Sequence, residues 1–523
     1  MKKTSTRKTA FIRRVTIGSS LLVALAAAQA ASAPFAVEET GIAEIHAAMQ
    51  RGDLTASQLL SRYLTRIDAY DQKGPKLNSV IVLNPQAAAQ ADSLDAEFRQ
   101  TKRLRPLHGI PVLLKDNVET AGLQTTAGSL SLKGYIPAQD AFLTKKLKEA
   151  GAIVIAKTNL HEFAVWGETV SSMAGQTLNP YDLTRTPGGS SGGTGAAVAA
   201  NFGTVGIGTD TINSIRSPAS ANSLVGLRPT LGLVSRGGIV PYSLTQDTAG
   251  PITRTVADAA RVLDAIAGYD PNDAATAASV GRQPKTYTAF LDADGLKGAR
   301  IGLLKSFFGT SAEHRDTNAV IDAAFDAMRK AGATVVMLDD PIDANALVGK
   351  TSVHLYDLEH DLDGYLKGLP AGVGVHSLKE VIASGKFHSG IEANIREAVT
   401  LDTASVEYKD RLIRRMNLQT QVLKIMADQR LDAIGFPHQK RLVVPVGQTQ
   451  VERNGVLGSV TGFPALVVPA GFSPPTPTAP IGVPVGLELL GRPYAEPTLL
   501  RIGYAFEQAT QRRRPPASSP SLR

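Results

Sequence analysis

The sequence predicts an α/β protein with one large mixed β-sheet covered by helices on both faces. Short apolar runs such as "HGIPVLLKDN", "GAIVIAKTN", "TVGIGTD" and "PALVVPAGF" have the length and composition of buried strands. Helical segments such as "AFLTKKLKEA" alternate with them, as expected for strands in a helix-covered sheet. With 43% hydrophobic and 20% charged residues, the 523-residue chain has a globular composition and can bury a large core.

The first thirty residues have the three regions of a secretory signal peptide. An uncharged run from Val15 to Ala30 follows a basic segment and ends in small residues, which predicts cleavage after Ala30. The run is shorter than the roughly 20 apolar residues that a membrane helix needs. We therefore expect a protein without a stable membrane span that is exported to the periplasm or secreted. The pair Arg13-Arg14 leaves the Sec and twin-arginine routes both open, and an uncleaved anchor is the alternative.

Residues 31–523 are expected to form a single domain. In "LTASQLLSRYLTRIDAYD" a helix capped by Thr55 or Ser57 is predicted. Its buried face would carry Leu59, Leu60, Tyr63, Leu64 and Ile67. The strands and helices of the core fall at about 106–268, and longer polar helices with strands at "ARIGLLK" and "ATVVML" form a helical elaboration at about 271–440.

Charge and residue usage exclude several functions. The formal net charge is +8, but the leader carries six basic residues and no acidic one, so the mature chain is +2. With no basic stripe, nucleic-acid binding is not expected. The chain has no cysteine, and its nearest histidine pair, His354 and His360, lacks the spacing of helical metal ligands. Neither a metal site nor a cofactor is predicted.

The stretch "GGSSGGTGAAVAANF", which begins at Gly188, holds the candidate nucleophiles. A flexible linker is disfavoured because a helix-forming segment follows at once. The pattern G-x-S-x-G centres a nucleophile elbow on Ser191, but the strand that should precede it is missing. A serine activated by a neutral lysine is the other possibility. Lys115, at the end of an apolar strand, suits that base because burial disfavours a charged amine, although a surface lysine has the same sequence context.

The chain resembles the amidase signature family, serine hydrolases of carboxylic amides with a Ser-Ser-Lys triad. The matching segments include "HGIPVLLKDN", "GQTLNPYDLTRTPGGSSGGTGAAVAA", "GIGTDTINSIRSPASANSLVGLRPTLGLVSRGGIVP" and "TGFPALVVPAGF". The resemblance spans about 42–510, is dense at about 106–268 and is thinnest at about 271–440. The segments "TTAGSLSL" and "QDTAGP" are most similar to the bacterial peptide amidase branch.

That resemblance implies the roles of individual residues. Lys115 would be the base, Ser190 the bridging serine after a cis peptide bond, and Ser214 the nucleophile. The oxyanion hole would be made of backbone N–H groups of Thr211, Ile212, Asn213 and Ser214. Ile212-Asn213 departs from the family, since many relatives have Gly-Gly there. Asp210 and Arg216 are interpreted as a structural ion pair near this loop.

The expected reaction is amide hydrolysis through an acyl-enzyme, by a monomer or homodimer. The segment "NLHEFAVWGETVSSM" is predicted to be a helix that brings Phe163, Trp166 and Met173 to the substrate, although an aromatic pair at this spacing is equally consistent with core packing. These apolar side chains favour small-molecule or peptide amides with apolar, aromatic or peptide groups.

Three alternatives remain. An esterase or carbamate hydrolase would use the same triad. An amidotransferase component that acts on tRNA in a cytoplasmic complex shares the fold, and the leader argues against it. A binding protein that kept the fold is disfavoured by the intact Lys115, Ser190 and Ser214.

Overall fold

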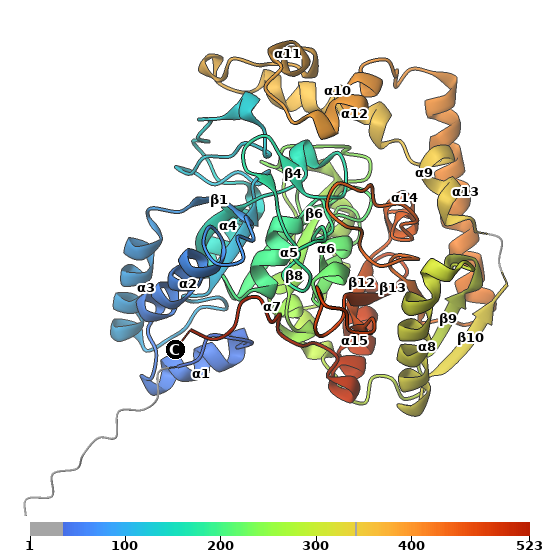
Figure 1. Cartoon of the computed structure of the whole chain (residues 1–523), viewed down its shortest axis with the longest axis horizontal. Coiled ribbons are helices and arrows are strands. Elements are labelled where there is room, and N and C mark those ends of the chain that lie inside the picture. Colours follow the sequence, from blue (N-terminus) through green and yellow to red (C-terminus); the bar gives the residue numbers. More distant parts are fainter. Residues whose placement is uncertain (1–34, 340–341, 523) are drawn as a thin grey trace, which may run out of the picture. The chain divides into compact units, whose positions relative to one another are not determined.

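The central feature is a mixed sheet of eleven strands, in a computed structural model that describes residues 35–339 and 342–522 (Figure 1). In sheet order the strands are β1 (Val80–Leu83), β3 (Ile153–Thr158), β2 (Pro111–Lys115), β6 (Val205–Asp210), β8 (Thr248–Thr253), β7 (Val225–Arg228), β12 (Ala465–Phe472), β13 (Pro484–Leu490), β11 (Ala433–Pro437), β9 (Arg300–Leu304) and β10 (Thr334–Leu338). Strand β2 is parallel to β3 and β6, whereas β6, β8, β7, β12, β13 and β11 pair antiparallel in succession. The predicted mixed sheet is confirmed.

Helices flank this sheet. They are α1 (Ile42–Arg51), α2 (Ala56–Tyr70), α3 (Ala87–Thr101), α4 (Phe142–Glu149), α5 (Gly192–Ala199), α6 (Arg216–Ala221), α7 (Val256–Ile266), α8 (Arg315–Lys330), α9 (Ala344–Lys350), α10 (His354–Lys367), α11 (Leu378–Ser384), α12 (Glu392–Ala398), α13 (Val406–Asp428), α14 (Val456–Thr461) and α15 (Glu496–Thr510). Helices α5 and α6 pack on each other and on the central strands, and α7, α8 and α15 form another layer on β8, β12 and β13. In Figure 1 the green segments α5, α6, β6 and β8 lie at the centre of the view, where the two helices pack on the sheet.

Helix α2 follows the sequence prediction closely. The Thr55 side chain accepts a hydrogen bond from the Gln58 N–H, and the Gln58 side chain accepts one from the Thr55 N–H, which forms a capping box. Leu59, Leu60 and Tyr63 are buried. Ile67 is buried as well and Leu64 is half-buried, so the cap at Thr55 and the predicted buried face are confirmed.

The helix predicted over 159–173 does not form. Only a 3₁₀ turn occurs, at Glu162–Ala164, and a short strand β4 (Val170–Ser171) paired with β5 (Gly175–Gln176) follows. Phe163, Ala164 and Thr169 have φ of 51°, 62° and 59°. A left-handed φ cannot continue a right-handed helix, so the apolar spacing in this segment does not describe one helical face.

The expected elaboration is joined to the core through the sheet. Helices α8 to α13 lie in it, as predicted, but its strands β9, β10 and β11 complete one end of the eleven-stranded sheet. Val37–Arg523 make up one compact unit. The predicted leader 1–30 and its cleavage site lie outside the described residues. Within 35–339 and 342–522, no helix has both the length and the apolar character needed to cross a bilayer.

Candidate active site

Lys115 is the last residue of β2, and its side chain is fully buried. Its Nζ donates hydrogen bonds to Ser190 Oγ at 2.8 Å and to Thr209 Oγ1 at 2.7 Å. Burial lowers the pKa of Lys115 to about 7, against the opposing effect of the Asp247 and Asp210 carboxylates. Burial thus favours the neutral amine, which can accept a proton.

Ser190 is held in the loop that leads into α5. Its side chain is buried, its carbonyl oxygen accepts from the His161 N–H at 3.0 Å, and the Gly189-Ser190 peptide bond is cis. A Cβ at Gly189 would lie 2.8 Å from the carbonyl carbon of Gly167, closer than packed atoms approach. Glycine at 189 therefore allows the loop to bring Ser190 to the lysine.

Ser191 has a different environment from its neighbour. Its Oγ donates to the Thr209 carbonyl at 3.2 Å and accepts from the Thr209 N–H at 3.3 Å. Its own N–H donates to the Ser214 carbonyl at 3.3 Å, which ties the two serine loops together. With its hydroxyl engaged by β6, Ser191 fits a supporting position better than that of an elbow nucleophile.

Ser214 lies in the loop between β6 and α6, 4% exposed, on a narrow cavity of about 30 Å³. Thr211, Ile212 and Asn213 line the same cavity. Among the described residues, nothing accepts a hydrogen bond from the backbone N–H groups of residues 211 to 214. Unpaired backbone donors beside a serine are what an oxyanion hole requires.

A buried network of charges supports this loop from behind. Asp210 pairs with Arg216 at 3.0 Å and with Arg228 at 2.8 Å, and Arg216 also pairs with Glu488. Burial alone would raise the pKa of Asp210, but the two arginines outweigh it and hold the pKa well below its usual range. Glu488 in turn lies 2.6 Å from Nδ1 of His438. The structure thus contains the predicted Asp210–Arg216 pair, extended by residues that sequence reasoning missed.

The signal that could have found Glu488 is its place in "PVGLELLG", where a carboxylate interrupts an otherwise apolar strand. A charge in such a run is buried only with partners. Ser459 of α14 offers no comparable signal, yet its Oγ donates to the Ile212 carbonyl. Arg216 Nη2 donates to that same oxygen at 2.8 Å.

The walls of the Ser214 cavity come from distant parts of the chain. Trp166, Tyr242, His354 and Arg453 line it, together with Ala164, Val165 and Val348. Of the three side chains predicted to bind substrate, only Trp166 lies here. Phe163 is buried in a core cluster with Leu362 and Leu366, because its left-handed φ turns it away from a helical face.

Met173, the third predicted side chain, lies elsewhere. It lines a separate surface depression with Ile67 and Ile81, and its N–H donates to the Gly128 carbonyl. The predicted helix would have carried Met173 toward the cavity. The β4–β5 turn carries it away instead.

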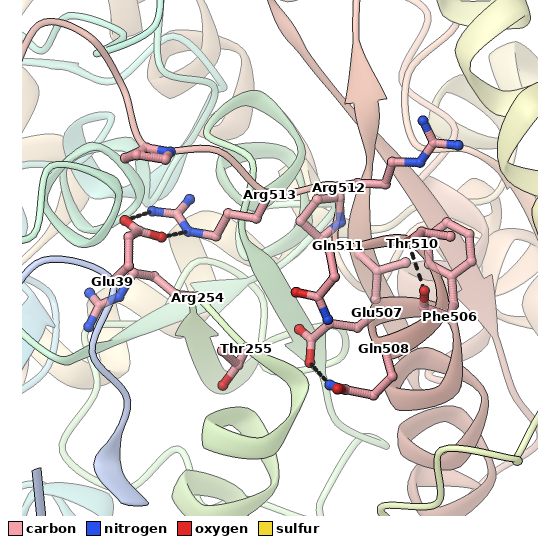
Figure 2. A pocket seen from close by; sticks show the side chains of 13 residues that line it. Glu39, Arg254, Thr255, Phe506, Glu507, Gln508, Thr510, Gln511, Arg512 and Arg513 are labelled. Carbon is pink, nitrogen blue, oxygen red and sulfur yellow. Dashed lines mark hydrogen bonds and ion pairs between the residues drawn. The ribbon is translucent and has the colours of Figure 1, made fainter. Parts of the chain in front are cut away.

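A further depression of about 400 Å³, drawn in Figure 2, contains none of the predicted site residues. Both threonine hydroxyls on its wall are engaged. Thr255 Oγ1 accepts from the Asp258 N–H, and Thr510 Oγ1 donates to the Phe506 carbonyl. Its lining contains neither a lysine nor a serine, so the Ser214 cavity remains the candidate active site.

Among the described residues, one cluster has the composition of a metal site: Glu313, His314 and Glu452. Nε2 of His314 lies 3.1 Å from Glu452, and Arg441 pairs with Glu452 at 2.6 Å and with Glu313 at 2.9 Å. The arginine pairs with both carboxylates. The arrangement is an ion-pair cluster, distant in sequence from the serine loops.

Fold and site together define an α/β protein in which a buried lysine contacts a serine close to a second serine flanked by free backbone N–H groups. Residues 58–500 match the sequence profile of the family described as Amidase, and the chain belongs to the amidase signature family.

Three similar proteins illustrate the range of that family. The crystal structure of a peptide amidase from Stenotrophomonas maltophilia is 40% identical, with a TM-score of 0.83, and the match covers 92% of this chain and 98% of that one. A probable amidase of Arabidopsis thaliana is 36% identical over 93% of both chains. A component of the glutamyl-tRNA(Gln) amidotransferase of Chloroflexus aggregans is 36% identical over 90% of this chain and 96% of its own.

Proposed function

We propose that this protein hydrolyses carboxylic amides through an acyl-enzyme on Ser214, with Ser190 relaying protons between Ser214 and Lys115. The observation that carries the proposal is the 2.8 Å hydrogen bond between Lys115 Nζ and Ser190 Oγ in a fully buried site. A lysine with a pKa of about 7 is a competent base at neutral pH.

In the acylation step, Ser214 Oγ forms a bond to the amide carbonyl carbon. The Ser214 proton passes to Ser190 Oγ as the proton of Ser190 passes to the neutral Lys115 Nζ. The carbonyl π electrons move to the oxygen, and the free N–H groups of residues 211 to 214 stabilise the resulting oxyanion.

The intermediate then collapses. The proton on Lys115 returns through Ser190 to the amide nitrogen, the C–N bond breaks and ammonia or an amine leaves. Water attacks the ester of Ser214 by the same relay, which releases the acid and restores the serine. A relay suits amides because the leaving nitrogen must be protonated before it departs.

The proposed substrates carry apolar, aromatic or peptide groups next to the scissile amide. Support comes from the cavity walls, where Trp166, Tyr242 and Val348 lie close to Ser214. Similarity to the Stenotrophomonas maltophilia peptide amidase, at 40% identity, points in the same direction. The resulting activity is that of a hydrolase of linear amides.

The test compares Ser214→Ala with Ser191→Ala on a panel of primary amides, anilides, peptide amides, esters and carbamates. We expect Ser214→Ala to lower kcat/KM for amides by at least about 1,000-fold while circular dichroism shows a folded protein. Ser191→Ala should lose far less activity, because it removes a contact to Thr209 rather than the nucleophile. The reverse ranking would restore Ser191 as the nucleophile.

Two other activities can be tested with the same protein. If esters or carbamates are cleaved and amides are not, the protein is an esterase or carbamate hydrolase with this triad. The 36% identity to an amidotransferase component favours a second candidate. Glutamine-dependent amidation of glutamyl-tRNA, assayed with the partner proteins of such a complex, would reveal that role.

A further inference from the structure

The guanidinium of Arg453 is a charged group in the Ser214 cavity without a polar partner. Its Cζ lies 4.8 Å from the centroid of the Trp166 ring, and both side chains line the cavity. Among the described residues, no hydrogen bond or ion pair engages its side-chain nitrogens, in contrast to Arg216 and Arg228 nearby. A contact with the ring through the cation–π interaction uses none of the five guanidinium N–H donors.

The local backbone is shaped to hold this side chain. A Cβ at Gly167 would lie 2.6 Å from Arg453 Nη1, so a larger residue there would displace the guanidinium. Trp166 and Gly167 are therefore both next to the Arg453 guanidinium. Glycine at 167 thus leaves the space beside Trp166 that the guanidinium occupies.

The groups that face Arg453 do not compete for its donors. Burial lowers the pKa of Arg453, and the negative charge of Glu168 opposes that shift from beyond ion-pair distance. Glu168 accepts a hydrogen bond from the Gln450 N–H at 2.8 Å. His354 is neutral because burial lowers its pKa to about 3, and the Tyr242 hydroxyl donates to the Val165 carbonyl.

Trp166 also lies on the wall of a second, wider depression of about 420 Å³. That depression is lined by polar side chains that include His161, Glu168, Gln176 and Asn394. Trp166 is thus shared by the narrow cavity at Ser214 and a wider depression with polar walls. A substrate that extends from one into the other passes the side chain on which Arg453 is stacked.

We propose that Arg453 determines substrate specificity by donating hydrogen bonds to the carbonyl oxygen of a second amide group next to the scissile one. N-acylated amino-acid amides and peptide amides carry such an oxygen, and simple amides do not. A carbonyl is favoured over a carboxylate because Glu168 already supplies a negative charge, and the apolar walls at Val165, Ile212 and Val348 penalise a second one. This inference rests on the proposed amide hydrolysis.

The experiment uses three substrates with one skeleton: N-acetylphenylalaninamide, 3-phenylpropanamide and benzylmalonamate. They share the benzyl group and the primary amide, and carry an acetamido group, a hydrogen or a carboxylate at the same carbon. For Arg453→Met we expect the ratio of kcat/KM between the first two substrates to fall by about 10- to 100-fold, the range for a hydrogen bond to a charged group. Arg453→Lys should keep part of the preference, because it retains the charge without the fork of donors.

The matched control is Arg282→Met. Arg282 also stacks on an aromatic ring, that of Tyr494 at 4.9 Å, but it lies outside the cavity. Its loss should leave the ratio unchanged. An equal fall for both substrates in Arg453→Met would overturn the proposal, because it indicates a structural role. A fall confined to benzylmalonamate would also overturn it, in favour of carboxylate recognition.

Binding separates this inference from the proposed reaction. In a Ser214→Ala background, adding Arg453→Met should raise the dissociation constant for N-acetylphenylalaninamide by about 10-fold or more, as measured by calorimetry. If the wild-type protein cleaves no amide but this difference is found, the proposed function fails and the recognition by Arg453 stands. Equal dissociation constants in the two variants would overturn the recognition.

Discussion

Arg216 Nη2 donates a hydrogen bond to the carbonyl oxygen of Ile212 at 2.8 Å. The Ser459 hydroxyl donates to the same oxygen from α14. In a planar trans peptide the C=O and N–H groups point in opposite directions. The carbonyl of Ile212 is thus fixed toward the buried network, and the N–H of Asn213 is directed away from it, toward the Ser214 cavity. Two donors thus hold the peptide between Ile212 and Asn213.

The first prediction follows from that contact. Ser459→Ala removes one of the two donors that hold the peptide, so we expect kcat for amides to fall by about 3- to 10-fold with little change in KM. Steady-state kinetics measure both quantities. The control is Ser279→Ala, since Ser279 is also buried and donates to a backbone carbonyl, that of Thr276, away from the site. A raised KM with normal kcat would indicate a role in substrate binding instead.

The second prediction concerns pH. Burial lowers the pKa of Lys115 to about 7, and the neutral form of the amine is the base. The fraction of active enzyme therefore rises with pH, and kcat/KM should increase up to about tenfold per pH unit below 7 and level off above it. A profile of kcat/KM from pH 5 to 9 with a neutral amide measures this rise and the plateau above it. A profile that is flat across this range contradicts the assignment of Lys115.

Other groups that titrate near this pH must be separated from Lys115. Burial lowers the pKa values of His161 and His354 to about 3, so neither side chain makes kcat/KM change near pH 7. Burial raises the pKa of Glu507 to about 7, but Glu507 lies in the depression of Figure 2. Glu507→Gln should leave the rise of kcat/KM toward pH 7 unchanged, whereas Lys115→Met should lower the rate by several orders of magnitude.

The sequence predicts those parts of the site that depend on local patterns. The apolar run before Lys115 defines a buried strand, and the small residues after Ser191 define the helix that packs closely beneath the loop. The helix predicted around Phe163 does not form, because several residues there have a left-handed φ. The apolar spacing of the sequence does not encode the contacts that stabilise this conformation. Ser459 and Arg453 reach the site through the order of strands in the sheet, which joins segments more than 200 residues apart.

The third prediction concerns export. We propose that the native protein is released outside the cytoplasm after cleavage behind Ala30, because six basic residues precede an apolar run that ends in small residues. N-terminal sequencing of the protein from its own host should begin near Ala31. A sequence that begins at Met1 or Lys2 would contradict export and would strengthen the amidotransferase alternative.

The last prediction concerns substrate class. Trp166, Tyr242, Ile212 and Val348 contribute apolar surface to the wall of the Ser214 cavity. Burying an aromatic side chain against such walls contributes roughly 1.5 to 3 kcal/mol, which corresponds to about 10- to 100-fold in kcat/KM. We therefore expect aryl or peptide amides to exceed acetamide and malonamate by that factor, and Ile212→Ala to reduce the difference because it removes part of the wall. Values of kcat/KM that favour acetamide or malonamate would instead indicate a tight polar pocket, in which the apolar side chains serve packing alone.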